Sequence, residues 1–307
     1  MNKAPYHITS FNRTFTKYLF FLKELFARPI YITAVLHYSY GRLLHRNWGD
    51  DINIFFLKEL FQRNVFSFLH SLRARFLRKL HLGYNYLIIG SSITKLTNER
   101  SIIWGAGAIN DQEPLRIKPK KVLAVRGPKT REYLLRNGVE CPAVYGDPAM
   151  LIKYFYNPKI QKNYKLGIIP HFSDLDSPLL DPFRNDPEVL LIKMEGYEDW
   201  HDVIDEILSC EYIASSSLHG LIMAETFSVP NMWIEISGKA VIGGHFKFED
   251  FYESIGKKNI QPYRIDTSSS KKDLLLLMKN YQKGEINLNP LISNSPMKLT
   301  LPLRSSH

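Results

Sequence analysis

The chain has 307 residues, of which 45% are hydrophobic and 23% charged, so it has the composition of an ordinary globular protein and is too long for one small core. Its formal net charge of +10 indicates an anionic partner, such as nucleic acid, a phosphorylated small molecule or an acidic membrane surface. The two cysteines, Cys141 and Cys210, form no CxxC or metal-binding pattern, and we expect buried thiols in a reducing compartment.

The first residues predict a basic amphipathic helix. Residues 11–28 combine phenylalanines and leucines with lysines and arginines at helical spacing. Two alternatives stay open, because this helix could dock on the body of the protein or lie on an anionic membrane. A transmembrane helix needs roughly 20 apolar residues, and Lys23, Arg28 and Pro29 interrupt the best candidate. No signal-peptide cleavage pattern follows, so we expect a cytoplasmic protein, peripheral at the inner face of the cell membrane under the second alternative.

A first buried strand and a polar loop come next. Residues 31–38, YITAVLHY, are β-branched and aromatic and predict the strand. The loop ends in Asn47, Gly49, Asp50 and Asp51. Open α/β sheets bind ligands at the carboxyl ends of their strands, so this loop is a candidate part of a site.

Two helical segments follow the loop. Residues 52–69 carry an apolar stripe and predict a helix. Residues 72–82, LRARFLRKLHL, add a cluster of basic side chains. Such a run is more often a solvated face than a binding site, although it agrees with an anionic partner.

Short apolar runs then predict further parallel strands, at residues 86–90, 101–104 and 121–125. The second run leads into GAGA at residues 105–108, where the backbone can approach a ligand closely. This is not the GxGxxG of a dinucleotide site. The third run leads into RGPKT at residues 126–130, which opens a helix with proline near its start.

A second series of alternating strands and helices begins after residue 164. The alternation predicts right-handed βαβ crossovers and a parallel sheet. Its predicted strands cover residues 165–170, 189–192, 212–214 and 231–236, and its predicted helices cover residues 201–209, 219–227 and 271–283. The tail from about residue 284 is rich in Asn, Pro and Ser, and we expect it to be loose or packed as coil.

The two series together predict an α/β protein with two Rossmann-like domains facing a cleft, parallel sheets and an N-terminal amphipathic helix. The polar stretch 153–164 is the predicted boundary between the domains. The predicted units are the basic helix at 1–30, an N-terminal domain at 31–155, a C-terminal domain at 160–265, and a final helix and tail at 266–307.

The stretch 212–230 holds the strongest candidate for a site. Serines at 215–217 are good N-cap residues, because a hydroxyl can accept the free N–H groups of a first helical turn. His219 and Gly220 follow at the helix start, where unpaired N–H groups and the positive end of the helix dipole favour an anion. The alternative is a strand–helix corner in which His219 is only a cap or packing residue.

A set of motifs resembles the polysaccharide pyruvyl transferase family. The motifs are NWGDDIN at 47–53, WGAG at 104–107, VRGPKT at 125–130, GDPA at 146–149, IIPHFSD at 168–174, SSLHGLIMAE at 216–225 and FKFEDFY at 246–252. Each is weak alone, but their order and spacing fit from about residue 32 to residue 252. The basic N-terminal helix and the C-terminal tail lie outside the resemblance.

The resemblance implies a GT-B-like fold, with the acceptor on the N-terminal domain and the donor on the C-terminal one. It also implies transfer of pyruvate from phosphoenolpyruvate to a sugar of a surface polysaccharide or cell-wall glycan, usually as a ketal across two hydroxyls. Phosphoenolpyruvate is then a substrate, and neither a cofactor nor a metal is expected. Some members carry a donor-binding arginine directly before Leu-His-Gly, where this chain has Ser217. Donor binding would therefore rest on the other cations in the motifs, Arg126, Lys129 and Lys247.

We hypothesise that His219 contacts the donor phosphate or acts as general acid, and that Asp50, Asp51 or Asp147 takes a proton from the acceptor hydroxyl. An aspartate before proline often only shapes a turn, and His171 could equally serve loop structure. The predicted site residues are His219, Asp50 and Asp147 as catalytic groups; Arg126, Lys129, Ser216, Ser217, Leu218, Gly220 and Lys247 at the donor; and Asn47, Asp51 and His171 at the acceptor.

Two other functions remain as alternatives. A sugar-nucleotide glycosyltransferase could use the same scaffold, because a fold does not fix its chemistry. A non-enzymatic module for anions or nucleic acid would also explain the net charge. The basic residues lie among glycine-rich strand-end loops and not on one aromatic stripe, which argues against nucleic acid. The predicted partners are thus phosphoenolpyruvate and a saccharide, for which a lipid-linked form stays open, with no nucleic acid.

Overall fold

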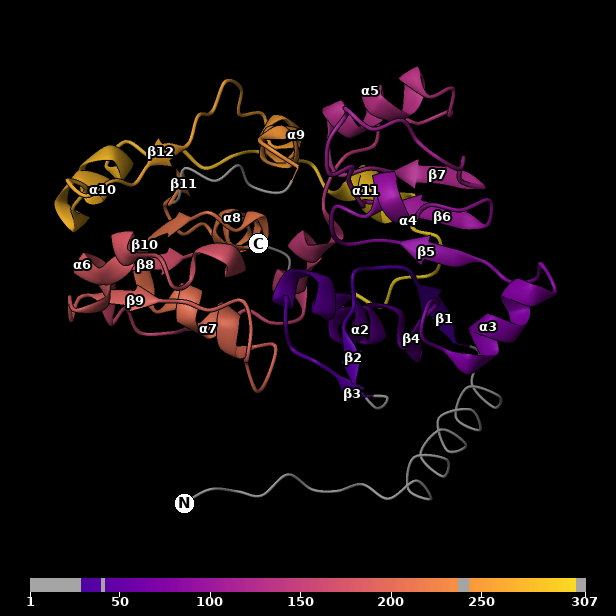
Figure 1. The fold of residues 1–307 in the computed structure, drawn as a ribbon, viewed down its shortest axis with the longest axis horizontal. Coiled ribbons are helices and arrows are strands. Elements are labelled where there is room, and N and C mark those ends of the chain that lie inside the picture. The colour runs from indigo at the N-terminus through magenta and orange to yellow at the C-terminus, as the bar shows by residue number, and fades with distance from the viewer. Residues whose placement is uncertain (1–28, 40–41, 237–242, 302–307) are drawn as a thin grey trace, which may run out of the picture.

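The structure, a computed structural model, describes residues 29–39, 42–236 and 243–301. The helix predicted over residues 11–28 lies outside this part of the chain. The described chain has an α/β fold with two five-stranded parallel sheets, which confirms the α/β class and the parallel sheets of the prediction (Figure 1). A short antiparallel pair, β2 (Tyr38–Ser39) and β3 (Arg42–Leu43), lies apart from both sheets.

The N-terminal sheet has the strand order β4-β1-β5-β6-β7. Its strands are β1 (Ile30–Ile32), β4 (Val65–Ser67), β5 (Asn85–Leu87), β6 (Ser101–Trp104) and β7 (Lys121–Ala124). The helices of this half are α2 (Trp48–Phe61), α3 (Leu72–Lys79), α4 (Ile93–Leu96), α5 (Pro128–Arg136) and the 3-10 helix η1 (Pro148–Tyr154).

The C-terminal sheet has the strand order β12-β11-β10-β8-β9. Its strands are β8 (Tyr164–Ile169), β9 (Val189–Leu191), β10 (Cys210–Ser215), β11 (Asn231–Glu235) and β12 (Tyr263–Arg264). The helices of this half are the 3-10 helices η2 (Phe172–Asp174) and η3 (Pro178–Leu180), and α6 (Asp181–Arg184), α7 (Asp202–Leu208), α8 (Leu218–Thr226), α9 (Phe246–Ser254) and α10 (Lys271–Met278). Helix α11 (Asn289–Ser293) follows in the C-terminal tail.

The two sheets share one topology. In each sheet the first strand of the chain lies between the second and the third, so β1 lies between β4 and β5, and β8 lies between β9 and β10. The winding direction reverses at this point, and open α/β sheets bind ligands beside it. The segments that follow β1, β5, β8 and β10 are therefore where a site is expected.

The helix predicted over residues 52–69 is wrong at both ends. Helix α2 begins at Trp48, with Asn47 extended as its N-cap (φ −152°), so Asp50 and Asp51 lie in its first turn and not in the predicted loop. Carboxylates in a first turn interact favourably with the helix dipole. The helix ends at Phe61 because Gln62 is left-handed (φ 49°), and the next residues form β4, whose pairing with β1 outweighs the helical stripe.

The first predicted strand, over residues 31–38, is too long. Strand β1 ends at Ile32, and its ladder with β5 ends one residue later, where the Thr33 N–H donates to the Tyr86 carbonyl (2.8 Å). Tyr38 belongs to β2 instead. The later predicted strands are confirmed with small differences at their ends.

The C-terminal tail is a packed part of the fold and not only coil. It contains α11, whose Leu291 is fully buried and accepts a hydrogen bond at its carbonyl from Trp104 Nε1 (2.9 Å). Further on, the Thr300 N–H donates to the Leu60 carbonyl (2.9 Å). The tail thus returns to the N-terminal half, and Figure 1 shows α11 in yellow beside β6.

One hydrophobic core cluster joins the two halves. It includes Ile32 and Trp104 in the N-terminal sheet and Ile169 and Trp233 in the C-terminal one. The Trp48 indole N–H, at the start of α2, donates to the Trp200 carbonyl just before α7 (2.7 Å). In the described part of the chain, every helix is too short or too polar to cross a bilayer.

Candidate active site

Lys247 lies at the centre of the predicted site residues. It is the second residue of α9, it is only 8% exposed, and its ammonium lies 5.2 Å from the centre of the Phe248 ring. Within the described ranges no hydrogen bond or ion pair to its ammonium is found. Burial, and then the Arg126 charge, lower the Lys247 pKa to about 8, while Asp50 opposes this shift. A buried cation in this setting favours an anionic ligand.

His219 stands beside this lysine in the first turn of α8. Its side chain is buried, and its Nε2 atom has no hydrogen-bond partner among the described residues. Burial, and then the charges of Arg126 and Lys247, lower the His219 pKa to about 3. The imidazole is therefore neutral near pH 7 and presents an unpartnered nitrogen to the site.

The start of α2 packs directly against this imidazole. A Cβ atom on Gly49 would lie 1.9 Å from His219 Nδ1, so no other residue fits at this position without moving the ring. The N-termini of α2 and α8 therefore meet at His219, one from each half of the protein. Two positive helix ends at one point strengthen the preference for an anion.

The predicted capping of α8 by serine hydroxyls is not observed. Ser217 is the extended N-cap (φ −95°), but its side chain makes no capping hydrogen bond. The Ser215 hydroxyl accepts from the Ser217 N–H (3.0 Å), and the Ser216 hydroxyl accepts from the His171 N–H (2.8 Å). Among the residues that the structure describes, no side chain therefore caps the first-turn N–H groups of α8, which include those of Leu218 and Gly220. Such groups are suited to an anionic ligand.

Asp50 and Asp51 face different surroundings. Burial, and then the charge of Asp51, raise the Asp50 pKa to about 7, and Lys247 partly offsets this. Asn47 Nδ2 donates to Asp50 (2.5 Å). Asp51 instead accepts from the Tyr197 hydroxyl (2.9 Å) and interacts electrostatically with His45, away from the lysine. Asp50 is thus the member of the pair that belongs to the Lys247 cluster.

Arg126 is fully buried and held by the protein. Its Nε donates to Asp250 (3.0 Å), and its terminal nitrogens donate to the Ser91 hydroxyl (2.6 Å) and the Ala108 carbonyl (3.0 Å). Most of its N–H groups therefore have acceptors already. Its charge still acts on the site, because it lowers the pKa values of His219 and Lys247.

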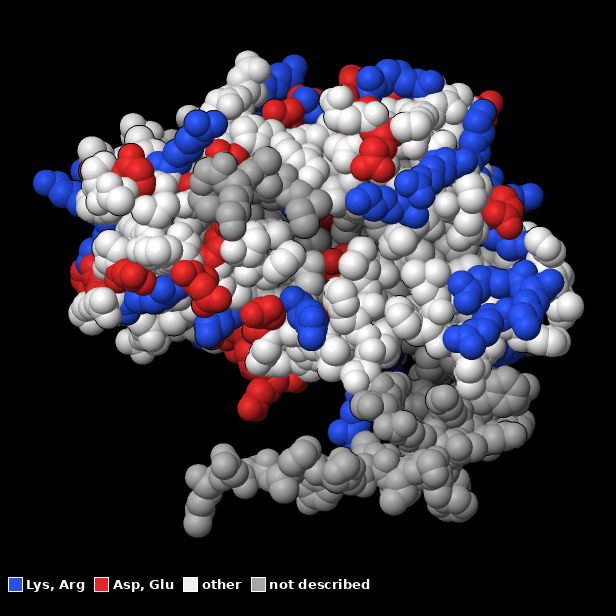
Figure 2. Space-filling model, viewed as in Figure 1, with Lys and Arg blue, Asp and Glu red and all other residues white. Residues whose placement is uncertain are grey.

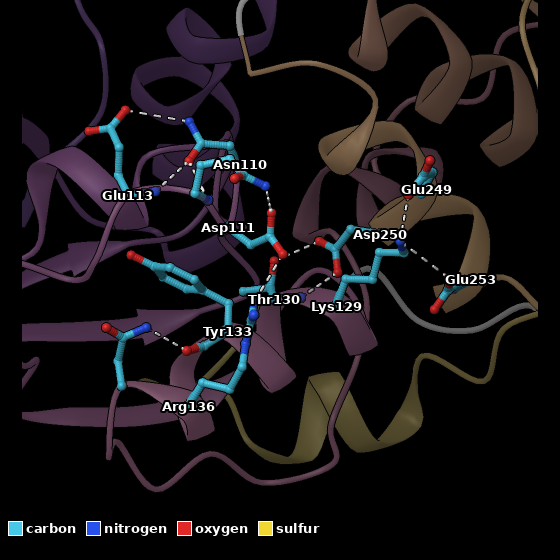
Figure 3. Close-up of polar contacts among 12 residues, drawn as sticks. Asn110, Asp111, Glu113, Lys129, Thr130, Tyr133, Arg136, Glu249, Asp250 and Glu253 are labelled. Atoms are coloured by element: carbon cyan, nitrogen blue, oxygen red, sulfur yellow. Dashed lines mark hydrogen bonds and ion pairs between the residues drawn. The ribbon is translucent and has the colours of Figure 1, made fainter.

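Asp250 anchors the start of α5 to α9. Besides Arg126 it accepts hydrogen bonds from the Thr130 N–H (2.8 Å) and the Thr130 hydroxyl (2.7 Å), the latter drawn in Figure 3. Lys129, the neighbouring predicted cation, turns to Glu249 (2.5 Å) and Glu253 (4.0 Å) on the same helix (Figure 3). The structure therefore does not bring Lys129 to the Lys247 cluster.

Two further predicted residues border the cluster. Asp147 is the N-cap of η1, where one carboxylate oxygen accepts from the Ala149 N–H (2.9 Å), as the turn-shaping alternative predicts. Its other oxygen is buried without a partner among the described residues, and burial raises the Asp147 pKa to about 6. His171 follows β8, and burial and the Lys247 charge lower its pKa to about 4. Both residues thus lie within the electrostatic reach of Arg126 or Lys247.

Among the described residues, the assembled site combines a buried cation without a partner, helix N–H groups without a capping side chain, and two carboxyl groups whose pKa values are raised toward neutral pH. It can bind an anion and move a proton beside it. Sequence reasoning placed Gly49 only in a candidate loop, and it missed two contributors, Asn53 and Asp250, although each lies within a motif. Asn53 joins α2 to the end of β5 by hydrogen bonds to the backbone N–H (3.1 Å) and carbonyl (3.1 Å) of Ile89. Within the described residues, no three His, Cys, Asp or Glu side chains gather as metal ligands.

One family model matches most of this chain, and several known proteins are similar to it. The sequence profile of a family described as "Polysaccharide pyruvyl transferase" matches residues 21–238. The succinoglycan biosynthesis protein ExoV of Rhizobium meliloti is 27% identical over 75% of this chain and 68% of its own length. An uncharacterised protein, L143, of Acanthamoeba polyphaga mimivirus is 27% identical over 69% of this chain and 72% of its own. A solved structure of a Klebsiella pneumoniae protein of uncharacterised function has 14% identity and a TM-score of 0.38, with 80% of this chain and 94% of that chain covered.

Proposed function

Because the chain belongs to the polysaccharide pyruvyl transferase family, we propose that it transfers pyruvate from phosphoenolpyruvate to a sugar of a surface polysaccharide or cell-wall glycan precursor. The product is a pyruvate ketal across two hydroxyls, and phosphate is released. The two sheets of equal strand order support a GT-B-like arrangement in which each half contributes one side of the site. One relative is named for the biosynthesis of succinoglycan, and we extend polysaccharide synthesis to this chain as part of the proposal.

The Lys247 ammonium, which has no ion-pair or hydrogen-bond partner among the described residues, carries the proposal. Phosphoenolpyruvate has a phosphate and a carboxylate, and the Lys247 cluster offers a buried cation beside the free N–H groups of α8. We assign the donor to this place, with Lys247 and the α8 start on its charged groups and the neutral His219 ring as a hydrogen-bond partner. Arg126 adds positive charge near the same site, as its effect on the Lys247 pKa indicates.

The reaction needs two kinds of proton transfer. A proton is added to the methylene carbon of the enol, the adjacent carbon becomes an oxocarbenium-like centre, and a sugar hydroxyl attacks it. Phosphate then leaves, and the second hydroxyl closes the ketal. The two hydroxyls release two protons, of which the methyl group takes up one and the released phosphate the other. Asp50, with a pKa of about 7, is suited to exchange these protons near neutral pH, and Asp147, with a pKa of about 6, is a second candidate.

The His219 pKa refines its proposed role. In the free protein the ring is neutral, because burial and two neighbouring cations oppose its protonation. A bound phosphate would counter those cations and raise the His219 pKa. We therefore propose that His219 is a phosphate ligand first, and that it becomes a proton donor only with the donor bound.

The function is tested by incubating the protein with phosphoenolpyruvate and a panel of galactoside, glucoside and N-acetylmannosamine acceptors. We expect phosphate release that depends on one acceptor, and a ketal methyl signal in the NMR spectrum of the product. Binding of a uridine or cytidine nucleotide, with no response to phosphoenolpyruvate, would instead identify a sugar-nucleotide glycosyltransferase.

Lys247→Met tests the donor site directly. Lys247→Met should lower kcat/KM about 100-fold or more, because it removes one preorganised charge at the reacting group. His219→Ala should abolish transfer in a protein that is still folded. Lys129→Met is the matched control, because that lysine already pairs with Glu249. Equal activity of Lys247→Met and the control would contradict the assignment.

A further inference from the structure

Helix α3 turns an apolar stripe toward solvent. Leu72, Phe76 and Leu80 recur every four residues and therefore lie along one side of the helix. Their exposed fractions are 40%, 60% and 50%, while Ala74 on another side is fully buried. Surface helices of soluble proteins normally show the opposite pattern, with polar residues outward. The exposed face of α3 therefore differs from the polar surface that a solvated helix normally presents.

The chain around α3 extends this apolar surface. Leu69 precedes the helix and is 36% exposed, and Leu82 follows it and is 52% exposed. Exposed apolar side chains that occur singly need no explanation, but a contiguous group marks an interaction site.

Positive charge surrounds the stripe. Arg73 and Lys79 lie on its two sides at helical spacing, and Arg75 lies next to Lys79. No aspartate or glutamate occurs in the sequence between Glu59 and Glu99. Arg75 and Lys79 are exposed, and neither makes an ion pair with any described residue. Figure 2 shows a patch of Lys and Arg side chains over the position of α3.

We propose that this α3 surface, formed by Leu72, Phe76, Leu80, Arg75 and Lys79, docks on an anionic lipid bilayer. An amphipathic helix with apolar side chains between cations lies in the interface of such a bilayer, with the apolar groups in the acyl boundary. The long basic side chains reach back to the lipid phosphates. A nucleic acid would satisfy the charges but would not bury a phenylalanine and two leucines.

The test is sedimentation of the full-length protein with vesicles of phosphatidylcholine alone or of equal parts phosphatidylcholine and phosphatidylglycerol. We expect binding to the anionic vesicles that weakens with salt. The triple variant Leu72→Ser, Phe76→Ser, Leu80→Ser should bind at least about tenfold more weakly, because its apolar insertion is lost. The double variant Arg75→Gln, Lys79→Gln should bind the anionic vesicles about fivefold more weakly for each charge removed. It should also lose most of the preference for anionic lipid over phosphatidylcholine.

Helix α10 offers matched controls. Leu276 and Leu277 are 59% and 55% exposed, and Lys272 and Lys279 are exposed on the same helix. The variants Leu276→Ser, Leu277→Ser and Lys272→Gln, Lys279→Gln should bind vesicles like the wild type. Circular dichroism of every variant is the control that the substituted chains are folded. The proposal is overturned if the wild type does not bind anionic vesicles, or if the α3 variants bind as well as the α10 variants.

Discussion

At the scale of single residues, burial sets the proton affinities of the candidate site. Removal from water disfavours either charge, so it raises the pKa of Asp50 to about 7 and lowers that of Lys247 to about 8. Their mutual attraction offsets only part of each shift. Both groups therefore change charge near neutral pH, which suits a site that must bind an anion and exchange protons.

Asp50→Asn should stabilise the protein relative to the wild type as the pH rises. The Asp50 pKa is about 7 in the folded protein and 3.8 as its ordinary value, so the folded state holds this proton more tightly. The wild type therefore loses stability as the pH rises between these values, whereas the neutral asparagine does not. In urea unfolding, the free energy of unfolding of the variant should rise by about 3 kcal/mol relative to that of the wild type between roughly pH 4.5 and pH 8.

The exposed Asp176 provides the comparison for this experiment. Asp176→Asn makes the same exchange of a carboxylate for an amide at an exposed position, and the pH dependence of Asp50→Asn is compared with it. A gain for Asp50→Asn that does not grow with pH would show that Asp50 is ionised in the folded protein at low pH.

Individual site residues differ in how far the sequence predicts them. His219 and Lys247 lie in recognisable motifs at element starts, so both could be predicted. Arg126 could be predicted as a cation but not as a buried one, because its partner Asp250 lies 124 residues further along the chain. One sequence does not reveal which cation a distant carboxylate neutralises, and the same limit applies to Lys129 and Glu249.

At the scale of elements, the site depends on the close approach of α2 and α8. Gly49 has no side chain, and the space of its missing Cβ is filled by the His219 ring. Within a helix, alanine is normally more stable than glycine by about 1 kcal/mol. A glycine in the first turn of α2 is therefore explained by this packing and not by helix propensity.

Gly49→Ala should destabilise the protein by about 1–3 kcal/mol and abolish most activity, because the new methyl group overlaps the imidazole. The double variant Gly49→Ala, His219→Ala should recover the lost stability, since the ring is then absent. Thermal unfolding of the two single variants and the double variant measures this coupling. Additive effects in the double variant would show that the glycine and the histidine do not touch.

Asp250→Ala should be among the most destabilising single changes in α9. It leaves the fully buried Arg126 charge without its carboxylate, and breaking a buried pair in this way costs about 3–5 kcal/mol. Glu249→Ala removes the partner of the partly exposed Lys129 and should cost less than about 1 kcal/mol. Chemical denaturation of both variants gives the comparison, and similar losses would argue against Asp250 as the anchor of α5.

The boundaries of α2 and β4 show where reasoning from local pattern stops. The apolar stripe over residues 52–69 fits a helix, but only a three-dimensional partner decides that its last part pairs with β1. The left-handed Gln62 that ends the helix carries no strong sequence signal, because it is not a glycine. Helix α8 and its flanking strands were predicted well, since a serine-rich turn separates apolar runs of clear length.

At the scale of the whole molecule, the alternation of strands and helices predicts two parallel sheets, and both are observed. The alternation does not predict the strand order, because pairing between segments far apart in the sequence determines which strands are neighbours in each sheet. The same holds for the tail, whose composition predicts coil but whose partners Trp104 and Leu60 lie far away in the sequence. Composition reports the average polarity of the tail and does not show that one leucine in it is fully buried.

Leu291→Ala tests whether the tail holds the two halves together. Leu291 is fully buried in the core cluster that includes residues of both sheets, so its truncation leaves a cavity and should cost about 2–5 kcal/mol. Leu276→Ala, at a residue that is 59% exposed, should change stability by less than about 0.5 kcal/mol. Because one core spans both halves, the loss should appear as a shift of a single unfolding transition, followed by tryptophan fluorescence. Two separated transitions in Leu291→Ala, with the N-terminal half melting first, would show that the tail stabilises that half alone.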